Sequence, residues 1–473
     1  MALFRLWVLL LCTVGLVGAF SIRWFLRRRQ SFWSRHGIPA AANPHLLYGN
    51  VAGIATKQHT STILQRLYRE FRERQLPAGG FNLFFSPVLL VIDRGLIERV
   101  LVKDFAQFQD RGLYACEKVN PLSSGQLFSV SGERWHRMRQ QLGPAFGSGN
   151  VRTMFTTAAR IAQTLTKYVT AQGGRRDLDW TDLMARYTTD VIGSCAFGID
   201  CHTIRDPRTE FRAMGYRAFR CSLRRMWKLR FGYAFRRVAN VLRLCVNEPP
   251  VERFFLQLCR STVLHRECYQ RVRRDFLQLL LEMRASGQLD MTQVAGQCYS
   301  FFIAGFETSA SLMSFSLFEL AKNRSVQEKL RNAIGAALEE TDGQLSYDVV
   351  MSLDTDYAID AFGTIPRGTL LAVPVHAIHH DPEYYPQPDE FNPDRFAKGT
   401  PTNGAPFIPF GLGPRHCIGA TFGQMLVKVG LLALVRSFRF TLDTDRTPEC
   451  VRFKPRSLVL VPSTGMYLNV ERV

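Results

Sequence analysis

Residues 406–419, which read PFIPFGLGPRHCIG, place a single cysteine in a loop rich in glycine and proline. The residues that follow, Ile418 to Leu434, have an apolar helical pattern, so Cys417 lies at the start of a predicted helix. Free N–H groups and the positive end of the helix dipole favour a thiolate there, and the thiolate is the form of cysteine that binds metal. Because free cysteine is commonly buried, a purely structural role stays open for Cys417 taken alone.

The sequence around this cysteine fits the longer pattern F-x-x-G-x-R-x-C-x-G, formed by Phe410, Gly413, Arg415, Cys417 and Gly419. The glycines permit a tight turn and the close approach of a flat ligand, and the planar guanidinium of Arg415 suits a carboxylate. The pattern resembles the haem-ligand loop of the cytochrome P-450 family, the haem-thiolate monooxygenases. The resemblance implies that Cys417 is the axial ligand of haem iron and that the other pattern residues bind the cofactor.

A second short motif lies in residues 133–146, which read ERWHRMRQQLGPAF. Trp135 and Arg139 are four residues apart, so they share one face if the stretch is helical. An indole N–H and a guanidinium that point the same way can bind an anionic group. The resemblance implies that this pair holds the haem propionates, and a basic surface helix is the alternative for the motif by itself.

Met291 to Ala321 predicts a long helix that is apolar nearly all round and therefore buried. It contains the run AGFETS at residues 304–309, where an acid and a hydroxyl stand side by side. A threonine in a helix often bonds the carbonyl one turn earlier, which is the structural interpretation. The run also resembles the family's oxygen-activation motif. That resemblance implies that Ala304 and Gly305 leave room beside the iron, while Glu307 and Thr308 relay protons.

The N-terminal stretch Leu6 to Phe20 is apolar and uncharged, with Arg5 before it and Arg23, Arg27, Arg28, Arg29 and Arg35 after it. With the following residues tilted into the interface, the stretch is long enough to span a bilayer. The run Val17-Gly18-Ala19 resembles a signal-peptide cleavage site, which is the alternative. Because more positive charge follows the segment than precedes it, the sequence predicts an uncleaved anchor with a cytosolic body.

The sequence predicts three parts: a transmembrane anchor over 1–26, a basic, proline-containing linker over 27–50 and a catalytic domain over 51–473. The resemblance implies a mainly α, single-domain cytochrome P-450 fold with a small β region behind the anchor. Local patterns predict a helix at Thr62 to Glu73, two short strands within Leu83 to Asp93 that Pro87 separates, and a strand at Leu370 to His376.

The chain has 473 residues, a net charge of +20 and 11 cysteines without paired spacing, which favours a reducing compartment over a disulfide framework. The positive charge suits an anionic membrane, an acidic protein partner or a nucleic acid. Arg220 to Arg237 interleaves basic and aromatic residues, which fits either a nucleic acid or a membrane interface. Since the chain carries an anchor, we expect membrane lipids and no nucleic acid.

The resemblance implies an enzyme, an oxidoreductase that inserts one oxygen atom from O2 into a lipophilic small molecule. Its cofactor would be haem, and electrons would come from NADPH through a flavoprotein reductase. The expected location is the membrane of the endoplasmic reticulum, with a single-pass anchor and a cytosolic catalytic domain.

One family element is missing from the sequence. Residues 393–396, which read PDRF, match the family's P-E-R-F element, whose arginine completes a buried ion triad with an E-x-x-R helix. That helix should lie between Leu353 and Arg367, where the sequence contains no glutamate. Glu328 and Arg331 have the spacing but lie one helix too early. Loss of a buried partner for Arg395 costs ~3–5 kcal/mol, so the alternative function is a catalytically impaired membrane-anchored haem protein.

Overall fold

The computed structural model describes residues 1–114, 116–173, 177–220, 222–270, 272–273, 275–339, 347, 369–396 and 406–473. Its helices are α1 (Ala2–Gln30), α2 (Phe32–Arg35), α3 (Thr60–Glu73), α4 (Arg94–Glu98), α5 (Phe105–Phe108), α6 (Pro121–Gly125), α7 (Gly132–Leu142), α8 (Ser148–Ala171), α9 (Trp180–Ile192), α10 (Glu210–Phe219), α11 (Leu223–Ala234), α12 (Arg236–Val241), α13 (Pro249–Tyr269), α14 (Phe276–Ala285), α15 (Met291–Lys322), α16 (Arg324–Glu339), α18 (Val375–Ile378) and α19 (Ala420–Ser437). Its strands are β1 (Ala78–Leu83), β2 (Ser86–Val91), β3 (Leu370–Ala372), β4 (Phe438–Leu442) and β5 (Leu468–Arg472).

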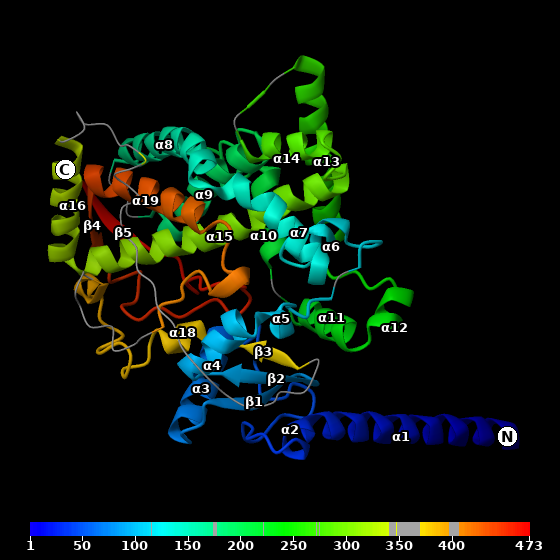
Figure 1. Cartoon of the computed structure of the whole chain (residues 1–473). Helices are drawn as coiled ribbons and strands as arrows, with labels where there is room; N and C mark the ends of the chain where they lie inside the picture. The colour runs from blue at the N-terminus through cyan, green and yellow to red at the C-terminus, as the bar shows by residue number, and fades with distance from the viewer. Residues whose placement is uncertain are drawn as a thin grey trace. The chain divides into compact units, whose positions relative to one another are not determined.

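Helices therefore dominate the described chain, as the predicted fold class requires (Figure 1). The chain divides into two compact units. Unit 1 comprises Met1–Phe108, Tyr357–Asp389 and Lys398–Pro414, and unit 2 comprises Gln109–Asp356, Glu390–Ala397 and Arg415–Val473.

Unit 1 contains a sheet in the order β1-β2-β3. The strand β2 runs antiparallel to β1 and parallel to β3, with Val88 opposite Leu370. The prediction of two strands within residues 83–93 is wrong, because β2 alone lies there and contains Pro87. Proline is tolerated as the second residue of this strand because pairing with β3 begins only at Val88. The helix predicted at Thr62 to Glu73 is confirmed by α3.

The strand predicted from Leu370 to His376 is shorter than expected. It ends at Ala372, and α18 begins at Val375. Pro374 stands directly before α18, and because it has no N–H it cannot continue a ladder of hydrogen bonds.

The segment after the anchor packs on the sheet of unit 1. Trp33 is fully buried, and its Nε1–H donates to the carbonyl of Phe81 at 3.1 Å. Gly80 makes room for this indole, since a Cβ there would lie 2.3 Å from the ring. The amide of Ala41 donates to the Gly80 carbonyl, and the Gly80 amide donates to Pro39, both at 2.8 Å. Trp33 is thus part of the core of the unit, and residues 39–41 lie along the edge of its sheet.

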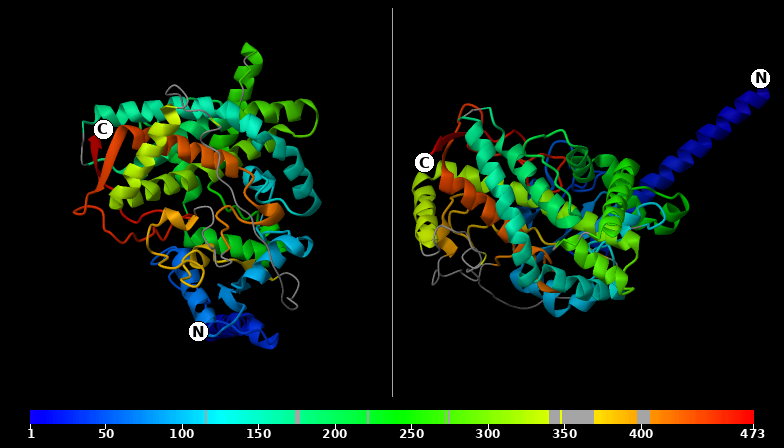
Figure 2. Two further views of the ribbon diagram at one scale, coloured as in Figure 1. Left: turned by 60° about the vertical axis from the view of Figure 1, so that its left-hand side comes forward. Right: turned by 90° about the horizontal axis from the view of Figure 1, so that it is seen from above.

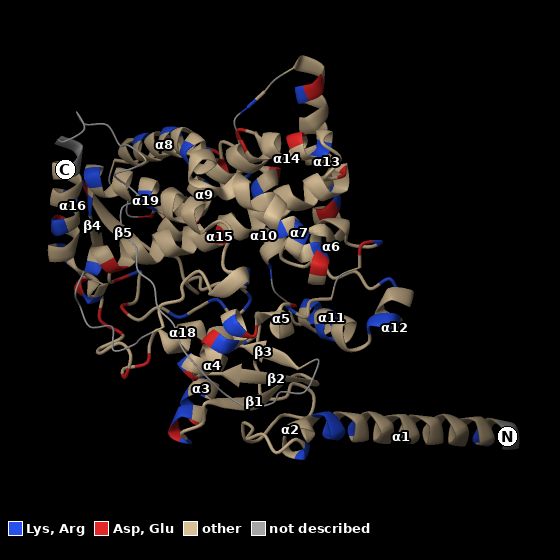
Figure 3. Ribbon diagram, in the orientation of Figure 1, with Lys and Arg blue, Asp and Glu red and all other residues tan. Residues whose placement is uncertain are grey.

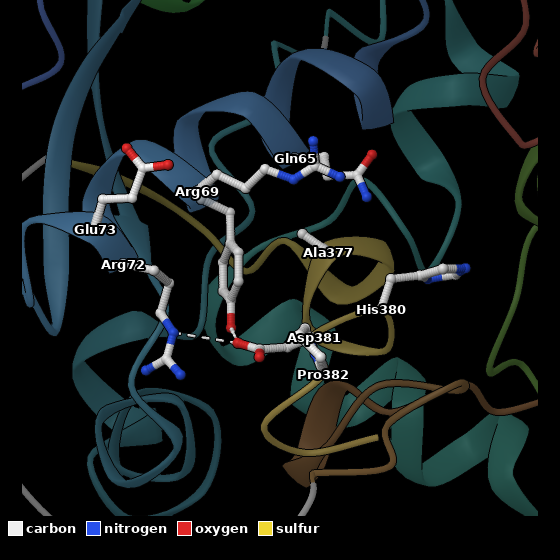
Figure 4. Close-up of a pocket in the computed structure, with 9 residues that line it drawn as sticks. Gln65, Arg69, Arg72, Glu73, Ala377, His380, Asp381 and Pro382 are labelled. Carbon is white, nitrogen blue, oxygen red and sulfur yellow. Dashed lines mark hydrogen bonds and ion pairs between the residues drawn. The ribbon is translucent and has the colours of Figure 1, made fainter. Parts of the chain in front are cut away.

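A small cavity of about 170 Å³ in unit 1 adjoins α3 and the residues that follow α18 (Figure 4). Asp381 is buried beside it and accepts a hydrogen bond from the Tyr68 hydroxyl at 2.5 Å. Arg72 points toward the same carboxylate, with Nε 3.2 Å from Oδ2. Tyr68 and Arg72 lie on α3 and Asp381 follows α18, so these contacts hold the two segments together.

Unit 2 is built around α15, which confirms the predicted buried helix. It begins with a capping box in which Asp290 and Gln293 satisfy each other's backbone N–H groups. The Thr188 hydroxyl on α9 donates to the Phe306 carbonyl on α15 at 3.0 Å, and Tyr187 donates to the Leu426 carbonyl on α19 at 3.2 Å. Figures 1 and 2 show α19 beside α8, and β4 pairs with β5 in a separate two-stranded sheet.

Among the residues that the structure describes, three helices are long and apolar enough to cross a membrane by length and composition. Met291–Lys322 and Ala420–Ser437 are about half buried inside unit 2, whereas Phe4–Gln30 has none of its apolar window buried. Arginines gather at the C-terminal end of α1 (Figure 3), where Arg28 and Arg29 lie over the rings of Trp24 and Phe25. The helix expected for the anchor is therefore present.

Candidate functional site

The cysteine loop leads into α19, as the sequence predicts, with Gly419 directly before the first helical residue. Cys417 is exposed, and the amide of Gly419 donates to its sulfur. Protein packed around the thiol raises its pKa, and this outweighs the lowering effect of Gly419, Arg139 and Arg111. The Gly419 amide at the start of α19 and the two arginines thus act in the expected direction, toward the thiolate.

Phe410 and Gly413 belong to the part of the loop in unit 1. Gly413 has φ +70°, and a Cβ there would lie 1.9 Å from the carbonyl oxygen of Leu101, so the position requires glycine. Phe410 is partly buried. These two predicted residues stay predictions as cofactor contacts.

Arg415 is held rigidly within unit 2. Only 10% of its side chain is exposed, Nε donates to the Gln109 carbonyl at 2.8 Å and Nη2 donates to the Val130 carbonyl at 3.1 Å. Its guanidinium lies 4.1 Å from the ring centroid of Trp135, which is itself buried. Burial and the nearby charge of Arg111 lower the pKa of Arg415 to about 10.

The helix α7 confirms that Trp135 and Arg139 are one turn apart. Arg139 reaches the cysteine loop, where its Nη1 donates to the carbonyl of His416 at 3.0 Å. The structure thus brings three predicted residues, Trp135, Arg139 and Arg415, next to Cys417.

Arg111 is a fourth site residue, which the sequence analysis missed. Its Nη2 donates to the Arg415 carbonyl at 3.4 Å, and its guanidinium lies 4.1 Å from the ring centroid of Phe128. Burial and the charge of Arg139 lower its pKa to about 10. Arg111 stands in a loop without periodicity, so no local pattern could have identified it.

Arg111, Arg139 and Arg415 form the arginine cluster of this site. Like charges repel, and burial makes the repulsion stronger. Within the described ranges, the carboxylate found beside the cluster is Asp110, 3.9 Å from Arg415 and half exposed. An excess of guanidinium charge beside a cysteine, with Arg415 largely buried, Arg139 partly buried and Arg111 exposed, fits a ligand with two carboxylates and a metal, and haem is such a ligand.

The oxygen-motif residues lie on two faces of α15. Ala304, Thr308 and Leu312 are exposed at i, i+4 and i+8 of a helix that is otherwise largely buried, so this face borders open space. The Thr308 hydroxyl donates to the Ala304 carbonyl at 2.5 Å, which is the back-bonded geometry expected for a helical threonine. A Cβ on Gly305 would lie 2.4 Å from the side chain of Ile192 on α9. The glycine therefore lets α9 pack closely against α15, and it does not border the open face.

Glu307 is largely buried, and its Oε2 has no hydrogen-bond partner among the residues that the structure describes. Burial raises the pKa of Glu307 to about 7, although the charge of Lys454 opposes the shift. A carboxyl group with such a pKa can both give and take a proton near neutral pH.

Aromatic contacts connect the two halves of the site. Phe301, one turn before Ala304 and Gly305, lies with its ring centroid 4.9 Å from that of Phe422 in the first turn of α19. Phe146 contacts Phe301 at 5.3 Å. The oxygen motif and the start of α19 therefore occupy neighbouring positions in unit 2.

The missing E-x-x-R helix was predicted within residues that lie outside the described ranges. Arg395 itself is only partly buried, and its Nη2 donates to the Glu390 carbonyl at 3.1 Å. The cost expected for a fully buried, unpartnered arginine therefore does not apply. Glu328 and Arg331 do pair on α16, at 2.5 Å, and Glu328 also binds Arg439 on β4 at 2.8 Å.

A mainly helical protein with an accessible cysteine on a glycine loop, set beside a cluster of guanidinium groups, has the design of a haem-thiolate protein. The family model described as Cytochrome P450 matches residues 39–355 and 352–469. The chain belongs to this family. It is 35% identical to "Cytochrome P450 6a2" of Drosophila melanogaster, over 96% of this chain and 97% of the relative. It is also 35% identical to "Cytochrome P450 6A1" of Musca domestica, over 98% of each chain.

Family membership gives the general activity. The protein is a cytochrome P450 monooxygenase, an oxidoreductase with haem and a cysteine thiolate ligand, supplied with electrons from NADPH through a reductase. Its substrates are lipophilic in general terms. The two matched parts meet at residues 352–355, inside the stretch without an E-x-x-R helix. The alignments run over 497 and 503 positions, more than the 473 residues of this chain, so the relatives carry residues without a counterpart here.

Proposed function

We infer that Cys417 supplies the thiolate ligand and that Trp135 and the arginine cluster hold the two propionates of haem. The observation that carries this proposal is the excess of guanidinium charge beside Cys417, whose pKa burial raises and the charges of Arg139 and Arg111 lower. Haem, when bound, supplies the activation of O2 for insertion of one oxygen atom into the substrate. Arg415 contributes a positive charge that is fixed in place, because its Nε and Nη2 donate to the carbonyls of Gln109 and Val130.

The test of this proposal is the spectrum of the reduced protein with carbon monoxide. We expect the long-wavelength Soret band of thiolate ligation, and Cys417→Ala should abolish it. Cys450→Ala, which changes another exposed cysteine of unit 2, should leave the band in place. An unchanged band in Cys417→Ala would remove Cys417 from the site.

Glu307 and Thr308 are the proposed proton relay. Because the Thr308 hydroxyl hydrogen is directed to Ala304, its oxygen lone pairs remain able to accept a proton-bearing partner. Glu307 stands next to it with a pKa near neutrality and an oxygen that the described residues leave without a partner. Ala304 lies on the same exposed face, and its short side chain leaves room beside Thr308 for a flat cofactor.

The proposed substrate is a lipophilic small molecule that packs against aromatic side chains near the oxygen motif. The ring of Phe306 lies 5.5 Å from that of Tyr216 and 5.9 Å from that of Phe219, both on α10. Apolar rings stabilise a bound compound in proportion to the apolar area that is buried, and they make no directional polar contacts that would select one functional group. Phe306 and Phe219 are buried, so Tyr216, which is 39% exposed, is the ring of this group that a lipophilic compound can contact.

The proposed organisation is a transmembrane anchor over 1–26, a linker over 27–50 and a catalytic domain over 51–473, with the body on the cytosolic side of the endoplasmic reticulum. The arginines that follow the apolar stretch of α1 support this orientation. Basic and aromatic residues on α11 and α12 (Figure 3) fit the headgroup layer of the same membrane. Protease added to sealed microsomes should digest the body, and full protection would refute the orientation.

The specific electron donor is proposed to be a membrane-bound flavoprotein reductase with an acidic docking face. The net charge of +20 supports this pairing. Electron transfer should slow as salt screens exposed charges, with a Debye length of ~8 Å at physiological ionic strength. If the rate of electron transfer does not depend on salt concentration, the positive charge of the protein serves membrane binding and not docking of the reductase.

A second candidate function, an impaired haem protein, is favoured by one specific observation. The family match breaks at residues 352–355, where the helix that pins the cysteine loop in other members is missing from the sequence. On this proposal the chain folds and anchors but captures haem poorly and turns over little or not at all.

A further inference from the structure

The C-terminal hairpin, residues 452–463, packs along one stripe of α15. Its two arms are joined by the Phe453–Pro462 bridge and by a hydrogen bond from the Lys454 amide to the Val461 carbonyl at 2.8 Å. The Ser311 hydroxyl on α15 donates to the Leu460 carbonyl of the hairpin. One turn further along, the ring centroids of Phe315 and Phe453 are 6.0 Å apart.

Glu307, Ser311 and Phe315 follow at i, i+4 and i+8, so they form a single stripe of α15. The hairpin covers the last two members of this stripe. Lys454 comes directly after Phe453, and its charge acts on the first member, Glu307. The exposed stripe of Ala304, Thr308 and Leu312 lies alongside, so the hairpin borders the proposed proton relay.

Two other elements bring charged or titratable groups to the surroundings of Glu307. Burial raises the pKa of the Tyr216 hydroxyl on α10, and the charge of Glu307 adds a smaller effect in the same direction. Arg212 donates to that hydroxyl at 3.0 Å and also pairs with Asp182 on α9. Asp182 thus balances the positive charge of Arg212. The cation whose charge lowers the pKa of Glu307 is Lys454.

We propose that Lys454 is a positioning residue that sets the charge state from which Glu307 passes protons to Thr308. This inference rests on the proposed role of Glu307 and adds a residue outside α15 to the relay. Burial alone favours a neutral Glu307, which would hold its proton too tightly to release it. An opposite charge favours the ionised form, so the ammonium group lets Glu307 alternate between its two forms near neutral pH.

Infrared difference titration of the full chain tests this proposal without requiring bound haem. The Glu307→Gln difference spectrum identifies the carboxyl band of Glu307, separating it from Asp190 and Glu319, whose pKa values burial also raises. In the wild type, the band of the protonated Glu307 carboxyl should disappear as the pH rises, with a midpoint at about pH 7. In Lys454→Met the midpoint should move to higher pH, while Lys454→Arg should restore it.

Arg456→Met is the matched control, because it removes one exposed charge from the same hairpin two residues away. It should leave the midpoint unchanged. A midpoint in Lys454→Met equal to that of the wild type would overturn the proposal. So would the absence of any Glu307 band that titrates between about pH 5 and 9.

A second measurement separates this proposal from the function on which it rests. In haem-loaded protein, the yield of product per NADPH consumed should fall in Glu307→Gln. In Lys454→Met it should fall below the wild-type yield most between about pH 7 and the higher midpoint of the variant, where only the wild-type carboxyl is ionised. If Glu307→Gln leaves the yield unchanged, the proposed relay is wrong. If Glu307→Gln lowers the yield but Lys454→Met alters neither yield nor midpoint, only the role of Lys454 is wrong.

Discussion

The guanidinium of Arg415 lies 4.1 Å from the ring centroid of Trp135, so the cysteine loop and α7 are joined by a buried cation–π contact. Such a contact contributes about 2 kcal/mol when it is desolvated. It fixes the position of Arg415 before any ligand arrives. The loop that carries Cys417 is therefore held in unit 2 by a residue whose partner lies in a distant part of the sequence.

Removal of Arg111 should weaken haem retention. A hydrogen bond to a charged group contributes about 1.5–3 kcal/mol, which corresponds to a loss of affinity of roughly 10- to 100-fold in Arg111→Ala. Haem transfer to an excess of a scavenger protein measures this loss. Arg134→Ala on α7, whose guanidinium pairs with Glu117 instead, is the control and should retain haem normally. Equal retention in both variants would exclude Arg111 from the site.

A chain with the family's E-x-x-R helix restored between Leu353 and Arg367 should capture haem better than the 473-residue form. The restored glutamate and arginine would pin the cysteine loop together with Arg395. Haem content per polypeptide and substrate turnover, measured on both forms in parallel, check this expectation. If the 473-residue form already gives a stable thiolate spectrum and equal turnover, the impaired function is refuted.

Glu307→Gln should alter how stability depends on pH. Burial raises the pKa of Glu307 from its ordinary 4.5 to about 7, so the folded state holds this proton more tightly than the unfolded state. The wild type therefore loses stability relative to the variant as the pH rises from about 4.5 to 7, by on the order of 3 kcal/mol. Above about pH 7 the difference should be constant. Denaturant unfolding of both proteins across this range gives the comparison, and a flat difference would contradict the assignment.

Trp33→Ala should destabilise unit 1 by ~3–5 kcal/mol, because it empties a fully buried site and leaves the Phe81 carbonyl without its donor. Leu47→Ala, in the same stretch but 44% exposed in the wild type, should cost far less. Thermal unfolding of the detergent-solubilised protein distinguishes the two. Similar losses in both variants would mean that Trp33 adds little to the core.

Much of the site could be predicted from the sequence because its motifs are local. Trp135 and Arg139 lie one helical turn apart, so spacing alone places their side chains on one face. Glu307 and Thr308 are adjacent members of one short sequence motif. Arg111 and Lys454 could not be found in this way, since tertiary packing brings them from unpatterned loops. The closeness of Gly305 to Ile192 is likewise a contact between helices.

The fold shows the same division. The long helix α15 was predictable from its apolar composition, whereas β1 and β2 were placed wrongly because Pro87 was taken to end a strand. Proline is compatible with the strand here, since the partner on that side starts one residue later. The role of Trp33 as a core residue was also hidden, because an isolated tryptophan in a basic, proline-containing stretch shows no periodicity.

The length of the uncharged part of α1 has a consequence for where the protein can reside. Although α1 has 29 residues, its stretch between Arg5 and Arg23 spans only about 26 Å at 1.5 Å per residue. The hydrocarbon layer is ~27 Å thick in the endoplasmic reticulum and ~32–33 Å in sterol-rich plasma membrane. Hydrophobic mismatch would force the thicker bilayer to thin around this helix, at a cost that grows with each ångström. Bilayer thickness alone therefore disfavours export of the protein along the secretory route.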